Sequence, residues 1–195
     1  LKSKKKLHEI QSYFCLIDLF DKIKIKKITG KKDIIKFYGK FGKFVDKKDN
    51  SIVNVLNLLR KKNIISDQYL ISINKRIPVF GGMGGGTGNS ACLIKYLVKK
   101  KDNKLLLKFL INKIGTDLKL FFYKQGFLSN LNTVNTLSKK HKLHFLLVYP
   151  NIKCSTKHIY SKIKNYSPKS KYNFKKIKTK GKFIKLLINK SNDLQ

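Results

Sequence analysis

Several residue types are scarce in this chain. It has no tryptophan, three prolines and ten acidic residues among 195, and of its 45 basic residues only Arg60 and Arg76 are arginine. Nucleic-acid-binding proteins use arginine for bidentate contacts with phosphate and guanine. The net charge of +35, carried almost wholly by lysines spread along the chain, therefore favours the codon bias of an AT-rich genome. A basic RNA-binding protein stays an alternative.

Cysteines and long apolar runs are scarce too. Cys15, Cys92 and Cys154 are far apart and odd in number, so they predict no disulfide framework and favour a reducing compartment. No run approaches the 18 apolar residues of a membrane-spanning helix. The histidines and cysteines do not form the four-ligand cluster of a zinc site. We expect a cytoplasmic protein without a membrane partner and without a metal site of this kind.

The apolar periodicity predicts strands followed by helices. Alternation indicates strands at residues 7–19, 22–28, 33–37 and 68–74, and a short buried strand at 144–148. Helical spacing indicates helices at 52–62, 89–99, 104–113, 156–163 and 183–190, the first of them with N-cap candidates Asp49, Asn50 and Ser51. This order predicts a two-layer α+β domain.

The most informative segment is a glycine-rich loop. Residues 77–92 read IPVFGGMGGGTGNSAC, with six glycines between Gly81 and Gly88 and a helical pattern behind them. Glycines allow backbone N–H groups to converge, and the positive end of a following helix dipole faces the same point. This combination predicts a phosphate site. A Walker A loop is excluded because no lysine directly follows Gly88, and a dinucleotide fingerprint lacks its acidic residue about 20 positions later.

The loop resembles the second motif of the GHMP kinases, and most closely that of the members that phosphorylate 4-diphosphocytidyl-2-C-methyl-D-erythritol. The resemblance implies that ATP and Mg²⁺ bind here. The implied ATP-binding residues are Asn50, Lys75, Pro78, Gly82, Gly84, Gly85, Gly86, Thr87, Gly88, Asn89 and Ser90. Gly88 stands where the family has a second serine, so this chain lacks one hydroxyl of the family's loop.

Three further segments resemble motifs of the same kinases. Residues 115–121, GTDLKLF, match a segment whose aspartate is the catalytic base, although from the residues alone Asp117 reads as a cap or turn residue. Residues around His8 and residues 155–160, STKHIY, match segments that bind the cytidine of the substrate. The resemblance therefore implies Asp117 as the base and His8, Thr156 and Tyr160 as substrate-binding residues.

The resemblance also implies a fold and a reaction. The fold is the two-layer α+β N-terminal domain of GHMP kinases with a left-handed βαβ crossover in residues 1–150. Residues 151–195 hold a substrate-site helix, a linker and the start of a truncated C-terminal domain. The reaction is phosphorylation of the 2-hydroxyl of the cytidine-diphosphate-linked methylerythritol in the non-mevalonate pathway to isopentenyl diphosphate. The family's first and third motifs would lie outside residues 1–195, so we expect a partial chain with little activity. Another GHMP small-molecule kinase is the nearest alternative.

Overall fold

The computed structural model describes most of the chain in two units. The described residues are 11–98, 104–130, 133–137, 140–150, 152, 159, 161–163, 167–168, 177 and 179–190. One unit comprises Ile17–Phe122 and Leu147–Thr156, and the other comprises Leu1–Leu16, Tyr123–Leu146 and Lys157–Gln195. Because these units interleave along the chain, they do not test a domain boundary at residue 150, which stays a prediction.

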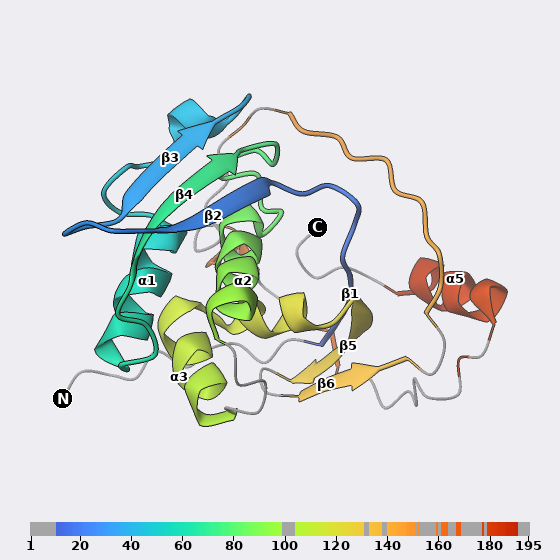
Figure 1. The fold of residues 1–195 in the computed structure, drawn as a ribbon. Helices are drawn as coiled ribbons and strands as arrows, with labels where there is room; N and C mark the ends of the chain where they lie inside the picture. Colours follow the sequence, from blue (N-terminus) through green and yellow to red (C-terminus); the bar gives the residue numbers. More distant parts are fainter. Residues whose placement is uncertain are drawn as a thin grey trace. The chain divides into compact units, whose positions relative to one another are not determined.

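The larger unit contains a three-stranded sheet with the order β2-β4-β3 (Figure 1). Its strands are β2 (Lys22–Ile28), β3 (Ile34–Tyr38) and β4 (Gln68–Asn74). β4 is antiparallel to β2 and parallel to β3. Alternating isoleucines in β2 and β4 point to one face, as the period of two requires, and the predicted strands at these positions are confirmed.

Helices cover one face of this sheet (Figure 1). They are α1 (Ser51–Lys61), α2 (Gly85–Leu97) and α3 (Lys104–Ile114), with short 3₁₀ turns η1 (Gly42–Phe44) and η2 (Thr116–Phe122). In α1, Ile52, Val55, Leu56 and Leu59 recur at helical spacing and are buried against β4 and α2 in a common core. The parallel pair β3 and β4 is joined through α1, so the unit is two-layered and contains a βαβ crossover. The left hand of this crossover stays a prediction.

The smaller unit has its own antiparallel sheet and core. The strands β1 (Ser12–Cys15), β5 (Gln125–Asn130) and β6 (Thr133–Thr136) have the order β1-β5-β6. Helix α5 (Lys180–Ile188) contributes Phe183, whose ring packs edge-on to Tyr13 at a centroid distance of 5.2 Å. Among the helices that the structure describes, none has both the length and the apolarity needed to cross a bilayer.

Besides the start of α2, three element predictions are wrong in extent or kind. The strand predicted at 144–148 does not form, and Leu146 and Val148 are 91% and 81% exposed, so an apolar run without a strand partner does not make a strand. β1 is much shorter than the predicted 7–19, whose first residues lie outside the described part. Helix α5 begins before residue 183 because the Thr179 side chain accepts a hydrogen bond from the Lys182 amide and caps it there.

Helix α2 begins four residues earlier than predicted. Its first helical residue is Gly85, not Asn89, so the last glycines of the loop form the first turn of the helix. Glycine is a poor helix former, which is why the pattern favoured a later start. Tertiary packing at both ends of the loop overrides that preference. Most of the helix predicted at 156–163 lies outside the described residues.

Candidate active site

The glycine loop leads into the N-terminus of α2. Gly84 is the N-cap and has a left-handed φ of 65°, which a glycine adopts without a steric penalty. The first amides of a helix have no carbonyl partner within it, and they carry its positive dipole end. The loop, with Gly85 and Gly86 at the start of α2, lines a cavity of about 340 Å³. This turn can therefore accept an anion that enters the cavity.

Most of the predicted nucleotide-binding residues line this cavity together. They are Asn50, Lys75, Pro78, Gly82, Gly84, Gly85, Gly86, Thr87 and Asn89. Apolar side chains from the sheet and η1 line it as well, namely Phe37, Phe44 and Val45. The cavity thus combines an anion-binding helix start with an apolar wall, the two environments that a nucleotide needs.

Gly85 lies where two side chains leave no room. A Cβ at this position would be 2.9 Å from Ile77 Cγ2 and 3.4 Å from Lys75 Nζ. Lys75 is only 4% exposed, and this distance places its ammonium beside Gly85, the first residue of α2. The close approach of strand end and helix start depends on the missing side chain at Gly85.

A buried carboxylate, Asp21, holds the base of the loop. Lys75 Nζ and Asn89 Nδ2 donate to Asp21 Oδ2, the latter at 2.9 Å. The amides of Arg76 and Ile77 donate to Oδ1 at 2.7 and 2.9 Å. Burial alone would raise the pKa of Asp21, but the hydrogen bonds from Lys75, the two amides and Asn89 together hold it below its ordinary value.

No motif in the sequence indicates this role for Asp21. The residue stands between two predicted strands, where aspartate is common in turns. The lysine and the asparagine that it contacts are 54 and 68 positions away. The one usable signal was the scarcity of acidic residues, which makes each aspartate near a strand end worth examining.

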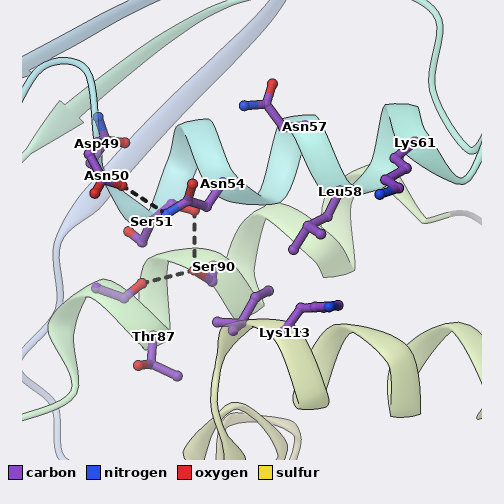
Figure 2. Close-up of a pocket in the computed structure, with 12 residues that line it drawn as sticks. Asp49, Asn50, Ser51, Asn54, Asn57, Leu58, Lys61, Thr87, Ser90 and Lys113 are labelled. Carbon is purple, nitrogen blue, oxygen red and sulfur yellow. Dashed lines mark hydrogen bonds between the residues drawn. The ribbon is translucent and has the colours of Figure 1, made fainter. Parts of the chain in front are cut away.

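A second cavity, of about 640 Å³, lies between α1, α2 and α3 (Figure 2). Asn54, Asn57 and Lys61 line it from α1, and Lys113 lines it from α3. It shares several lining residues with the first cavity, namely Asp49, Asn50, Ser51, Gly86 and Thr87. The first turn of α2 and the start of α1 therefore border both cavities.

Asn50 and Ser90 have structural contacts at this border. Asn50 Oδ1 accepts hydrogen bonds from the amides of Ile52 and Val53, both at 3.1 Å, which confirms the predicted cap of α1. Ser90 is fully buried, and its hydroxyl lies 3.4 Å from the Ser51 carbonyl oxygen and 3.2 Å from that of Gly86 (Figure 2). Asn50 therefore caps α1, and Ser90 fixes α2 against α1.

The η2 turn, which carries Asp117, packs against the glycines of α2. A Cβ at Gly84 or at Gly88 would be 2.9 Å from the Phe121 ring. Lys95 of α2 donates to the Phe121 carbonyl oxygen at 2.6 Å. The side chain that Gly88 lacks would occupy the space of this ring, so the departure from the family's serine has a packing consequence.

Asp117 itself is exposed at the start of η2. Burial lowers the pKa of the nearby Lys119, and the negative charge of Asp117 partly offsets that shift. Asp117 and Gly88 line neither cavity. The predicted substrate-binding residues His8, Thr156 and Tyr160 lie outside the described residues.

The chain is similar to known kinases over almost its whole length. None of the protein-family models matches it. It is 36% identical to the 4-diphosphocytidyl-2-C-methyl-D-erythritol kinase of Pelagibacter ubique, an alignment that covers 98% of this chain and 69% of that protein. It is 30% identical to the enzyme of the same name from Ureaplasma parvum, over 96% of this chain and 72% of that protein.

A solved structure supports the same fold. The crystal structure of a 4-(cytidine 5'-diphospho)-2C-methyl-D-erythritol kinase matches with a TM-score of 0.58 at 17% sequence identity, over 84% of this chain and 59% of that one. This confirms the predicted α+β fold class. From its sequence similarity to the two bacterial enzymes, the chain belongs to the 4-diphosphocytidyl-2-C-methyl-D-erythritol kinase family.

Proposed function

We propose that this protein transfers the γ-phosphoryl group of ATP to the 2-hydroxyl of 4-diphosphocytidyl-2-C-methyl-D-erythritol, a step of isoprenoid precursor synthesis. The observation that carries the proposal is the cavity at the start of α2, which most of the predicted nucleotide-binding residues line together, in a chain of this kinase family. Small-molecule kinases of this kind act mainly by positioning and charge stabilisation.

The triphosphate binds at the first turn of α2. The amides of Gly85, Gly86 and Thr87 are the first in the helix, and they supply N–H donors together with the positive dipole end. Phe44 and Val45, which line the same cavity, supply apolar surface for the adenine ring. Asn50 supports this site by capping α1, and Ser90 supports it by fixing α2 against α1.

Oxygen donors beside the loop fit a magnesium ion. Mg²⁺ prefers carboxylate and hydroxyl oxygens and the phosphates of its substrate. The Asp49 carboxylate belongs to a residue that lines the cavity, and it would hold the ion together with the phosphates. When bound, Mg²⁺ neutralises negative charge on the phosphates.

Asp117 accepts the proton of the acceptor hydroxyl. As that oxygen forms its bond to the γ-phosphorus, the bond from the γ-phosphorus to the bridging oxygen breaks and ADP leaves. Asp117 lies on η2, which is packed against α2 through Phe121, so base and phosphate loop belong to neighbouring elements. The assignment of His8, Thr156 and Tyr160 to the cytidine rests on their motifs.

Two measurements test the proposal. Calorimetric titration of the 195-residue chain with MgATP should show one saturable site, and ³¹P NMR of a reaction with the methylerythritol substrate should show a new phosphomonoester. If the protein binds ATP but phosphorylates a different alcohol, it is a kinase and only the proposed substrate is wrong. A chain that binds no ATP would contradict the proposal.

A further inference from the structure

We propose that Asp21 is a positioning residue of the phosphate-binding loop: its carboxylate joins the strand end before the loop to the helix after it, and it pairs the Lys75 ammonium beside Gly85. The inference rests on the proposed function, because it assigns Asp21 a role in ATP binding. It concerns a residue that does not itself line either cavity.

The two carboxylate oxygens have different partners. Oδ1 accepts the consecutive amides of Arg76 and Ile77, where the chain leaves β4. Oδ2 accepts hydrogen bonds from Lys75, which lies before the loop, and from Asn89, which lies in the helix after it. One side chain thus closes the base of the glycine loop. Because glycines give a loop many alternative conformations, an anchor of this kind selects the one that lets α2 begin at Gly85.

The charges at this position balance. The Asp21 side chain is fully buried and the Lys75 side chain is 5% exposed. An unpaired carboxylate here would repel phosphate, and an unpaired buried ammonium would be costly. Paired, the two leave the amides at the start of α2 as the donors for the anion. Lys75 therefore serves the site through the geometry that it shares with Asp21.

Asp33 provides a matched control at the other end of β4. Arg60 donates to both of its oxygens at 2.7 and 2.9 Å, and the Tyr69 amide donates to Oδ1 at 2.8 Å. Asp33 thus has a cationic partner and a backbone amide partner, as Asp21 does. It precedes β3 and contacts the start of β4, whereas the glycine loop follows the end of β4. Loss of Asp33 should therefore disturb the same sheet without disturbing the loop.

The experiment compares Asp21→Asn with Asp33→Asn in the 195-residue chain. The side-chain NH₂ group of an asparagine at position 21 would face N–H groups that donate to the Asp21 carboxylate in wild type. Hydrogen bonds at this position would be lost, so the loop should become less ordered. We expect both variants to unfold at lower temperature. Only Asp21→Asn should raise the Kd for ATP, by roughly 10- to 100-fold, since hydrogen bonds to charged groups are lost.

Hydrogen exchange without nucleotide gives a readout that is independent of ATP. Amides 76–90 should exchange faster in Asp21→Asn and remain as in wild type in Asp33→Asn. The double variant Asp21→Asn/Lys75→Met should regain thermal stability relative to Asp21→Asn, because the lone buried charge is removed, without regaining ATP affinity.

Three results would overturn the proposal. They are unchanged or tighter ATP binding by Asp21→Asn, equal weakening by Asp33→Asn, and unchanged exchange of amides 76–90. If the wild-type chain binds no ATP, the proposed function fails, and the exchange measurement alone decides whether Asp21 orders the loop.

Discussion

At the scale of single residues, Gly85 gives the sharpest test of the phosphate site. A valine there would place its Cβ 2.9 Å from Ile77 Cγ2, and its methyl groups would push the start of α2 away from Lys75. We expect Gly85→Val to abolish measurable ATP binding and to destabilise the fold by about 1–3 kcal/mol, as overpacking does. Calorimetric titration and urea unfolding measure the two effects.

Gly30 supplies the control for that change. No atom lies within 4 Å of a Cβ built at Gly30, so Gly30→Val should leave both ATP affinity and stability nearly unchanged. Normal ATP affinity in Gly85→Val would rule out the loop as the phosphate site.

Asp117 is the second residue-scale test. As the base, it acts on the acceptor hydroxyl, so in a restored full-length protein Asp117→Asn should lower kcat by roughly 10²- to 10⁴-fold, the usual contribution of positioned proton transfer. The Kd for ATP should stay the same, because the carboxylate does not meet the nucleotide. Steady-state kinetics with the methylerythritol substrate measure this, with the exposed Asp18 changed to asparagine as control. Near-normal kcat would make Asp117 a turn residue.

At the scale of elements, the contact between α2 and η2 explains the glycine at position 88. Gly88→Ser would restore the hydroxyl of the family's motif, but its Cβ would be 2.9 Å from Phe121 Cε1. We expect a stability loss of about 1–3 kcal/mol, most of it recovered in Gly88→Ser/Phe121→Leu. Thermal unfolding of the single and double variants measures it.

The control for this contact is Gly181→Ser in α5, where a Cβ meets no atom within 4 Å. It should be neutral or slightly stabilising, because serine is a better helix former than glycine. A Gly88→Ser protein as stable as wild type would show that the Phe121 ring moves aside without a loss of folding free energy.

The elements that were predictable have a clear period. β2, β4 and α1 follow strict alternation or helical spacing, so the sequence located them closely. β5 was missed because Gln125 and Gly126 are both buried within it, which breaks the alternation of polar and apolar residues. The strand expected at 144–148 failed for the opposite reason, since its apolar residues find no strand partner.

The phosphate site was only partly predictable. The glycine spacing indicated where an anion binds, because backbone conformation there depends on local residue type. Asp21 was not visible, since its partners are distant in sequence and its own neighbourhood reads as a turn. The contacts of Phe121 with Gly84 and Gly88 were likewise inaccessible, because they depend on how η2 packs against α2.

At the scale of the whole molecule, the hydrogen bonds of Asp21 predict how acid affects the fold. The folded-state pKa of Asp21 lies below its ordinary value of 3.8. Its contribution to stability is therefore complete above about pH 3.8 and is lost as the pH falls through the folded-state value. The free energy of unfolding, measured with urea between pH 7 and pH 2, should fall less with acid in Asp21→Asn than in wild type. An equal fall in the two proteins would contradict this assignment.

The net charge of +35 predicts a second, unspecific behaviour. Polyanions such as RNA should bind the lysine-rich surface, with an affinity that falls steeply with salt as counterions are released. Because the loop is not involved, Gly85→Val should leave this binding intact while ATP binding is lost. Fluorescence anisotropy with poly(U) at several KCl concentrations tests this. RNA binding that resists salt, or that ATP displaces, would favour an RNA-binding protein.

The lysines of β2 have a consequence for the behaviour of the protein at high concentration. Within the described residues, β2 pairs with β4 alone, so its outer backbone groups are open to a strand from another molecule. Lys24 and Lys26 are exposed along this strand, between isoleucines that face the core. Charged side chains on an edge strand oppose edge-to-edge association. The lysines of β2 thus help to protect this sheet from aggregation.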